Sequence, residues 1–488
     1  MKAFCSKYPR LSLVTLSILL SIVVVLVSCS LASFLYPSIA MQPYYNDPST
    51  FVIMGKELAS GKLPYREVFD HKGLYIFYVT FLYAYLGKFW IFMFMVSCMA
   101  VSIVFYVLTM KLLEFNKRTI VFGLLFFVSL YTFFAQFPGD ADLIVMVGMI
   151  MMYFYIKGYK GNNDKHYLNA CILAGVSAGI ALNIRPSDAM LGFAFMVFYI
   201  VKRIKEKKYL LMFRDCALCI LALGLTALPA YIHAYCSHFI RAMVDAVFFS
   251  NLKYLGSASD KSVVLVWMSR FIVLGIFGGL LLLWFFKRKE YQFEESLFIV
   301  TISIVLFIVQ FAIALFAHYL ISVSGFICLT LTIVMSKYHL LDEEKKTSKP
   351  LTIAITGVFG LALLFNPVLC LTHHQLDKGD IAYVKESISI EDRKAHTFLF
   401  STYPGLYLNT GISVIYPDFN AQTYHMKLSK EYTEENMSAF VQSETCHYLV
   451  TRKKEVATAT RLFGTANYVE IANNTGLPTT IVIYHHVI

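Results

Sequence analysis

The sequence predicts an all-α membrane protein that crosses the bilayer many times and ends in a small α/β domain. Three observations lead to this fold class. Of the 488 residues, 58% are hydrophobic and only 15% are charged, whereas soluble domains usually carry about 25% charged residues. The mean hydropathy of +0.63 is too high for a water-soluble fold of this size. Long apolar runs recur along the chain, and the composition becomes polar after residue 371.

Eleven apolar segments are long enough for membrane-spanning helices, which need roughly 20 apolar residues each. The first is too long and too apolar for a cleaved signal peptide, so we interpret it as a retained span. A further stretch, 74–87, is short and contains four tyrosines, and its status is ambiguous. The eleven segments are 11–36, 89–113, 119–136, 141–157, 167–184, 187–201, 210–236, 263–286, 294–316, 319–336 and 351–371.

The distribution of basic residues decides the status of 74–87, because cytoplasmic loops carry an excess of Lys and Arg. If 74–87 does not span and the N-terminus is cytoplasmic, every strongly basic short loop, including 202–208, falls on the cytoplasmic side. If 74–87 spanned, every later loop would be inverted. We therefore expect 74–87 to lie in the outer interface or to re-enter it. The segments then expected outside are 37–88, 237–262 and 372–488.

The net charge of +11 does not indicate nucleic-acid binding, because the basic residues lie in short loops between apolar runs. The ten cysteines do not form a disulfide framework, since most of them lie inside apolar runs. Cys216 and Cys219 make a formal CxxC motif, but within a hydrophobic segment, so we interpret them as small core residues.

The C-terminal region is polar and contains short β-type runs between turns. Its length, about 115 residues, suffices for one small domain. We therefore divide the chain into a membrane domain, 1–371, and an extracytoplasmic α/β domain, 372–488. The strands expected in the second domain are Thr397–Ser401, Ile412–Ile415, His447–Thr451 and Thr480–Tyr484.

The first outer loop, 37–88, carries two polar features. Asp47 lies shortly after the first span and just before an amphipathic helix expected to start at Pro48 and to end at Gly61. It is either a functional acid or the cap of that helix. Lys72 comes directly before the interfacial stretch, where it can pair with a lipid phosphate or anchor the chain to headgroups. The apolar face expected for the helix consists of Phe51, Met54 and Leu58.

Polar residues also stand at three later outer turns. Asp140 and Asp142 cannot share one face of a regular helix, so one of them caps the next helix while the other points inward, or both stabilise the helix start. Arg185 is the only basic residue in these turns and suits a phosphate or a carboxylate partner. His318 stands at the third turn, where a structural role is the alternative to a functional one.

In their order and common side, these motifs resemble those of the GT-C superfamily, the glycosyltransferases that use polyprenyl-phosphate-linked sugars. The chain looks closest to the bacterial relatives of protein O-mannosyltransferases and aminoarabinose transferases, over roughly 1–336 and more loosely over the outer domain. The Gly61–Gly73 stretch is similar to the family's G-x-x-P-Y-x-D…D-x-K-G/P pattern. The other features that carry the likeness are Tyr45-Asn46-Asp47, the acidic turn Pro138–Asp142 and the HY turn Phe316–Leu320.

The resemblance implies roles for Asp47, for Lys72 and for the acidic turn. Asp47 matches the family's proposed general base, which takes a proton from the acceptor hydroxyl as that oxygen attacks the anomeric carbon of the sugar. Lys72 matches the Lys near the lipid phosphate, whose charge nearby cations should stabilise as it leaves. Asp140 or Asp142 matches the second acidic position, where it would orient the acceptor or a cation. The remaining substrate-binding candidates are Arg66, His71, Arg185 and His318.

Two points stay open within the resemblance. The chain has Lys72-Gly73-Leu74 where relatives have Lys-Pro-Pro, which puts the local backbone and the reach of Lys72 in question. The sequence assigns no cofactor, but a divalent cation is compatible with the family, since some relatives need one and others do not. The pairs His373-His374 and His485-His486 lack metal-type spacing with a third ligand, so we assign no zinc.

The expected function is that of a bacterial cell-membrane glycosyltransferase acting on the extracytoplasmic face. Its partners would be a polyprenyl-phosphate-linked sugar donor, a cell-envelope polysaccharide or glycolipid acceptor, and the bilayer. A transporter or flippase of lipid-linked glycans is the alternative, but the helices between 89 and 336 have almost no ionisable residue at their centres. An envelope polymerase or ligase would commonly carry its large functional loop later in the chain.

Overall fold

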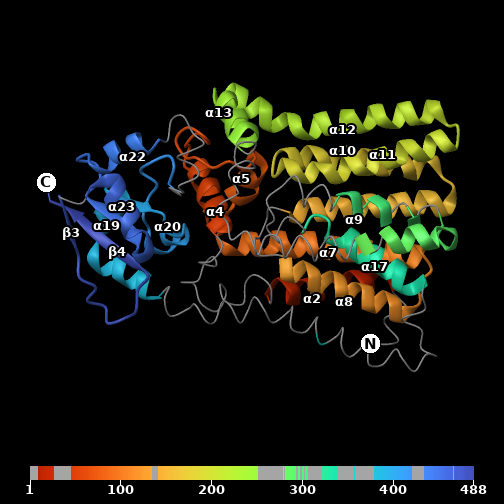
Figure 1. Cartoon of the computed structure of the whole chain (residues 1–488), viewed down its shortest axis with the longest axis horizontal. Helices are drawn as coiled ribbons and strands as arrows, with labels where there is room; N and C mark the ends of the chain where they lie inside the picture. Colours follow the sequence, from red (N-terminus) through yellow and green to blue (C-terminus); the bar gives the residue numbers. More distant parts are fainter. Residues whose placement is uncertain are drawn as a thin grey trace. The chain divides into compact units, whose positions relative to one another are not determined.

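The computed structural model describes residues 9–26, 46–134, 141–250, parts of 278–305, 321–337, 357, 378–419, 433–464 and 467–487. The chain is mostly helical, with one small sheet near the C-terminus (Figure 1). It divides into two compact units. Unit 1 comprises Met1–Ser28, Phe92–Ile232 and Ala258–Asn366. Unit 2 comprises Cys29–Ile91, His233–Ser257 and Pro367–Ile488.

Unit 2 therefore gathers three stretches that overlap the segments expected outside the membrane. They are far apart in the sequence, yet they fold as one compact body. The side of the bilayer on which this unit lies stays a prediction, because it rests on the distribution of Lys and Arg alone.

Unit 1 is a bundle of helices joined by short turns. The turn between α9 and α10 shows how the sequence ends one helix and starts the next. Asn162 adopts the left-handed conformation that commonly terminates a helix, and the Asn163 side chain accepts a hydrogen bond from the backbone of Lys165 at the start of α10. The described helices are α2 (Pro9–Val25), α7 (Lys88–Leu112), α8 (Lys117–Phe134), α9 (Asp142–Gly161), α10 (Asp164–Leu182), α11 (Ala189–Lys205), α12 (Tyr209–Cys236) and α17 (Ser324–Lys337).

Three of the described helices are long and apolar enough to cross a membrane. They are Phe89–Leu112, Asp142–Gly161 and Tyr209–Cys236, each of which reaches about the 30 Å of a hydrocarbon core. Eight of the eleven expected spans overlap described helices. The other three, 263–286, 294–316 and 351–371, lie largely outside the described residues. The number of eleven crossings therefore stays a prediction.

Glycines bring α10 close to its neighbours in unit 1 (Figure 1). A Cβ atom on Gly179 would lie 2.8 Å from the backbone oxygen of Leu223 in α12, and one on Gly175 would collide with the backbone oxygen of Cys219. These two glycines form a GxxxG pattern, which lets helix backbones approach closely. Gly192 of α11 meets α10 in the same way.

The stretch 74–87 forms two short helices, α5 (Leu74–Phe81) and α6 (Tyr83–Leu86). Even taken together, Leu74–Leu86 would be about 20 Å long, short of the roughly 30 Å hydrocarbon core. As a helix, this stretch is therefore too short to span a bilayer. Its location in the outer interface stays a prediction.

Helix α4 (Asn46–Ala59) differs from the expected surface helix. It begins two residues before Pro48 and ends shortly before Gly61, whose φ of +91° stops it. The sequence predicted one apolar face, but among residues 49–59 Lys56 alone is exposed, and Val52 and Ile53 are buried as well. The reason is that α4 contacts α5 and also α20 of the C-terminal region.

The C-terminal region contains a four-stranded sheet in the order β1-β2-β4-β3. The β1–β2 pair is parallel, while β4 is antiparallel to both β2 and β3. The strands are β1 (Thr397–Phe400), β2 (Tyr448–Arg452), β3 (Tyr468–Glu470) and β4 (Ile481–His486). The accompanying helices are 378–387, α19 (Ile390–Ala395), α20 (Gly405–Thr410), α22 (Glu434–Val441) and α23 (Val456–Phe463).

Three of the four expected strands are present, but the expected strand Ile412–Ile415 is wrong. Its apolar residues alternate as expected, with Ile412 and Val414 buried. Its backbone, however, bonds elsewhere: the Ser413 N–H donates to the Arg393 carbonyl, and the Val414 carbonyl accepts from the Lys62 ammonium. The segment is irregular chain whose backbone bonds to α19 and to the Lys62 side chain, and it is not a strand in a ladder.

Candidate functional site

The candidate residues fall into both units. Unit 2 holds Asp47, Arg66, His71 and Lys72, whereas unit 1 holds Asp142 and Arg185. Asp140 and His318 lie outside the described residues. The convergence of all these residues on one site therefore stays a prediction, and the geometry is given within each unit.

Tyr65 holds the turn that leads to Lys72. It is buried and adopts a φ of +64°, which is uncommon for a bulky residue and needs support from its surroundings. Its hydroxyl donates a hydrogen bond to the Lys72 carbonyl at 2.8 Å. Its ring packs against Phe77 of α5 and against Phe239, with centroids 5.9 and 6.1 Å away. The turn is thus fixed from two sides.

Lys72 is buried, and its main chain is held by a hydrogen bond. The Lys72 N–H donates to the Asp70 carboxylate at 2.8 Å, and Asp70 is itself buried. Only 7% of Lys72 is exposed, which is rare for a lysine unless an anion accompanies it. The turn therefore presents a pre-positioned cation directly before α5.

The start of α5 adds a second positive feature. Gly73 is its N-cap, and no side chain caps the helix there, so the partial positive charge of the helix N-terminus lies next to Lys72. Gly73 has φ −74° and ψ 158°, which is a conformation that proline also adopts. Gly73 thus has a backbone conformation that a proline at this position would also have.

The other two candidates of this turn lie differently. Arg66 is exposed at the tip of the turn, where the neighbouring Glu67 carboxylate accepts from the Leu63 N–H at 2.6 Å. His71 is partly buried, and its Nδ1 atom lies 3.9 Å from the Asp70 carboxylate. Of the three basic residues, Lys72 is therefore the one that the fold buries.

Asp47 lies in the first turn of α4. The helix that carries Asp47 packs directly on α5. The Thr80 hydroxyl of α5 donates to the Phe51 carbonyl of α4 at 2.7 Å. A Cβ atom on Gly55 would lie 2.7 Å from the Phe81 nitrogen, so only glycine permits this approach. The helix that carries Asp47 and the helix that follows Lys72 therefore form one packed pair.

Two residues that the sequence did not single out complete this part of unit 2. His233, in the last turn of α12, forms a hydrogen bond through Nδ1 with the Tyr78 hydroxyl of α5. The Phe239 ring lies 5.3 Å from the His233 ring and also contacts Tyr65. A lone histidine at the end of an apolar run carries no sequence signal for this contact.

Besides the contact between α4 and α20, two hydrogen bonds join the C-terminal region to the first loop. The Lys62 ammonium donates to the Val414 carbonyl at 2.8 Å and also pairs with Glu57 at 2.7 Å. The Phe69 N–H donates to the Pro417 carbonyl at 2.8 Å. These bonds lie on either side of the 63–68 turn that leads to Lys72, so the C-terminal region helps to fix that turn.

In unit 1, Asp142 is the first residue of α9 and is buried. Ala141 occupies the N-cap position without a side-chain cap bond, and the Asp142 carboxylate accepts a hydrogen bond from the Tyr131 hydroxyl of α8. Asp142 is thus buried in the first turn of α9, which both alternatives allow, and the choice between them stays a prediction because Asp140 lies outside the described residues.

Arg185 forms a buried ion pair. Its Nε and Nη2 atoms lie 2.8 and 2.6 Å from the Asp188 carboxylate, which also accepts from the Ser322 hydroxyl at 3.2 Å. The salt-bridge alternative is thus present, although the partner lies three residues ahead in the same turn rather than in the first outer loop.

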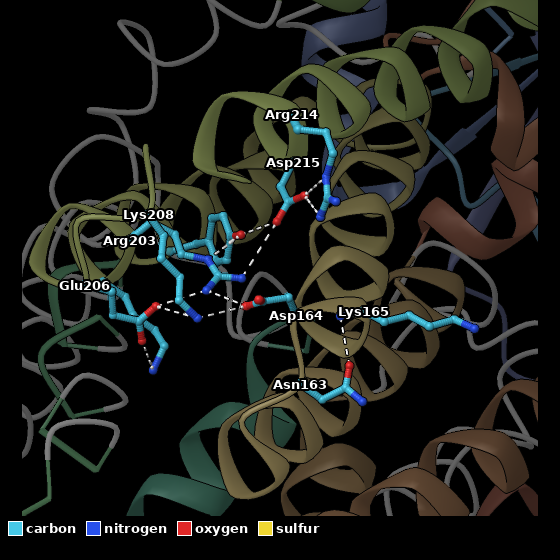
Figure 2. Close-up of polar contacts among 10 residues, drawn as sticks. Asn163, Asp164, Lys165, Arg203, Glu206, Lys208, Arg214 and Asp215 are labelled. Atoms are coloured by element: carbon cyan, nitrogen blue, oxygen red, sulfur yellow. Dashed lines mark hydrogen bonds and ion pairs between the residues drawn. The ribbon is translucent and has the colours of Figure 1, made fainter. Parts of the chain in front are cut away.

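A larger charged cluster lies at the other end of α10, where α11 ends and α12 begins (Figure 2). Arg203 is fully buried and pairs with Asp164 at 2.8 Å and with Glu206 at 2.9 Å. Its Nε atom donates to the Tyr199 hydroxyl, which in turn donates to Asp215. Helix α10 is about 28 Å long, which separates this cluster from the Arg185 pair. The cluster therefore binds helix ends together and is not part of the candidate site.

Among the described residues, one group has metal-ligating character. The possible ligand atoms of Asp392, His396 and His447 all lie within 4.8 Å of one another. In the sequence, only the adjacent pairs His373-His374 and His485-His486 suggested metal ligands. Of these, His373-His374 lies outside the described residues. In the other pair, His485 contacts the Tyr448 ring at a tilt and His486 stacks on Tyr468.

No protein-family model matches the chain. No curated protein matches it either. The chain is similar to a solved structure of the oligosaccharyltransferase of Archaeoglobus fulgidus, described as a complex with Zn and sulfate, with a TM-score of 0.46 and 13% sequence identity. The match covers 97% of this chain and 73% of that chain. A similarity at this level does not assign residues or an activity.

Proposed function

We propose that the protein is a membrane glycosyltransferase. In this proposal it moves a sugar from a polyprenyl-phosphate donor to a cell-envelope polysaccharide or glycolipid acceptor on the extracytoplasmic face of a bacterial cell membrane. The observation that carries the proposal is the packed pair of α4 and α5. One of these helices bears Asp47, and the other begins, without a side-chain cap, directly after the buried Lys72.

The donor side of this arrangement suits a lipid phosphate. A phosphate next to Lys72 would receive the ammonium charge and the N-terminal amides of α5 together. The apolar stretch that follows would accompany the polyprenyl chain. Large apolar side chains at its end, Tyr85, Leu86 and Phe89, are more than half exposed, as side chains that contact lipid would be.

The acceptor side requires a base. Asp47 takes the proton of the acceptor hydroxyl while that oxygen forms a bond to the anomeric carbon. The bond between the anomeric carbon and the phosphate oxygen breaks, and the lipid phosphate leaves with the electron pair. Lys72 stabilises the charge that develops on the leaving oxygen. The step needs no further reactant.

The remaining candidates take supporting roles in the proposal. Asp140 or Asp142 orients the acceptor or a divalent cation. Arg185 acts as one half of its ion pair, since Asp188 already neutralises its charge. The other substrate-binding residues proposed are Arg66, His71 and His318.

Sugar transfer by an Asp47→Asn variant tests the proposal. Purified protein in lipid vesicles receives a radiolabelled polyprenyl-phosphate sugar and envelope glycan acceptors, and the new glycosidic product is counted. Because a positioned base contributes roughly 10²- to 10⁴-fold, we expect at least a hundredfold loss of turnover. Lys56→Gln, an exposed change on the same helix, is the matched control and should keep wild-type turnover.

Full turnover in the Asn variant would remove Asp47 as the base. Wild-type protein that moves the labelled lipid between leaflets without any new glycosidic bond would instead favour the transporter alternative.

A further inference from the structure

The sheet of the C-terminal region brings two distant histidines face to face. Strands β1 and β2 are parallel, with Thr397 opposite Tyr448. The residues directly before them, His396 and His447, are therefore neighbours across the ladder. Their rings stack with centroids 3.9 Å apart and planes 12° apart, and the His447 N–H donates to the His396 carbonyl at 3.0 Å.

A carboxylate reaches the same place from α19. Asp392 and His396 are four residues apart, which puts them on one side of a helical turn. One oxygen of Asp392 lies 3.4 Å from Nδ1 of His447, and the other accepts a hydrogen bond from the Ser389 hydroxyl at 2.7 Å. The carboxylate is thus oriented toward the histidines by a neighbour that is not itself a ligand.

The distances between the possible ligand atoms suit a shared ion, and the two stacked imidazole rings must turn out of their parallel planes to point their nitrogens at it. Two ligands on a tetrahedral metal with bonds of about 2.0–2.1 Å lie about 3.3 Å apart, close to the 3.4 Å between Asp392 and His447. His396 Nδ1 lies 3.1 Å from the Thr445 carbonyl, so this nitrogen carries the proton and the Nε2 lone pair is available. The side chains of Asp392 and His447 are 26% and 30% exposed, which leaves a path for an ion.

We propose that Asp392, His396 and His447 form a binding site for a first-row divalent transition metal of the zinc type. Two imidazoles and one carboxylate suit such an ion, whereas Mg²⁺ and Ca²⁺ prefer sites made of oxygen alone. Three protein ligands leave one position for water or for a group of a bound partner. The ion ties the end of α19 to the starts of β1 and β2. The site is independent of the proposed transfer reaction.

Metal titration of the full-length chain, purified in detergent with any affinity tag removed and first treated with chelator, tests the site. We expect one Co²⁺ or Zn²⁺ per chain, with the intense visible absorption of four-coordinate Co²⁺. His396→Ala and His447→Ala should each weaken binding at least tenfold. His485→Ala is the matched control, because His485 lies in the same sheet, is also partly buried and contacts the Tyr448 ring.

Thermal unfolding provides the second readout and checks the fold of the variants. Zn²⁺ should raise the unfolding temperature of the wild type and of His485→Ala, and should not raise that of the two site variants. If a histidine variant fails to fold, Asp392→Asn keeps the size of the side chain and its bond to Ser389, and should show the same loss. Equal metal affinity in the wild type and in the site variants would overturn the proposal, as would a wild type that binds no ion.

Discussion

At the scale of single residues, the main chain of Lys72 is hydrogen-bonded on both of its polar groups. Asp70 accepts from its N–H and Tyr65 donates to its carbonyl, so both ends of the residue are fixed. A substitution of the Lys72 side chain leaves these two main-chain hydrogen bonds in place. The charge of Lys72 can therefore be removed without removing the turn.

Replacement of Lys72 by Met should lower kcat/KM for the lipid-linked donor. A hydrogen bond to a charged group contributes about 1.5–3 kcal/mol, which corresponds to roughly a 10- to 100-fold loss. Lys72→Arg should recover part of it, because the charge returns with a different shape. Initial rates at varied donor concentration provide the measurement, and an unfolding temperature equal to that of the wild type shows that the turn persists. A Met variant with unchanged donor kinetics would contradict the phosphate role.

The ion pairs of unit 1 show a limit of residue-scale reasoning. Arg185 is a candidate because it is the only basic residue of its outer turn. Its partner, Asp188, lies only three residues further along the chain. Their pairing depends on Pro186–Asp188 forming a short 3-10 helix, which turns the acid back toward the guanidinium. A lone charge in a sequence is therefore not necessarily lone in the fold.

At the scale of elements, the contact between α4 and α5 depends on Gly55. Replacing it with Ala would place a methyl group against Thr80 and 2.7 Å from the Phe81 nitrogen. Overpacking of this kind costs roughly 1–3 kcal/mol. We expect a lower unfolding temperature, and lower transfer activity although Gly55 contacts no substrate in the proposal.

Gly224→Ala is the control for this variant, because a Cβ atom on Gly224 of α12 would meet nothing within 4 Å. Its unfolding temperature should stay equal to the wild-type value or rise, since Ala favours a helix more than Gly does. If Gly55→Ala were as stable as Gly224→Ala, the close approach of the two helices would be wrong.

Strands were predictable where they are buried and apolar. The runs that became β1, β2 and β4 are such runs, and their interior residues pack in the sheet. The prediction failed at Ile412–Ile415. Alternation of apolar and polar residues indicates a half-buried chain, but it does not show which groups its backbone N–H and C=O bond to. Strand β3 was missed because it has three residues, of which two are exposed and carry no pattern.

At the scale of the whole molecule, the topology rests on counts of Lys and Arg. The structure shows that part of the basic loop 202–208 is neutralised, since Arg203 and Lys208 pair with Asp164 (Figure 2). The positive-inside rule counts basic residues and is not a net-charge rule, so the inference survives this pairing.

Reporter fusions test the topology directly. Alkaline phosphatase, which folds only outside the cytoplasm, should be active when fused after Ile488 and inactive when fused after Lys208. A fluorescent protein that matures only in the cytoplasm should give the opposite pattern at the same two positions. The reverse result would invert the assignment and place unit 2 inside the cell.

The sequence by itself determined the membrane class, most helix positions, three of four expected strands and the candidate acids and cations, because these follow from local hydropathy, charge and short motifs. Only the tertiary structure decided that the first loop, the end of α12 and the C-terminal region fold as one unit, that Arg185 is paired, and that His396 meets His447. The physical reason is that these contacts join groups that meet only after the chain has turned back on itself or after two strands have paired in register. A single sequence shows such groups, but it does not show which of them meet.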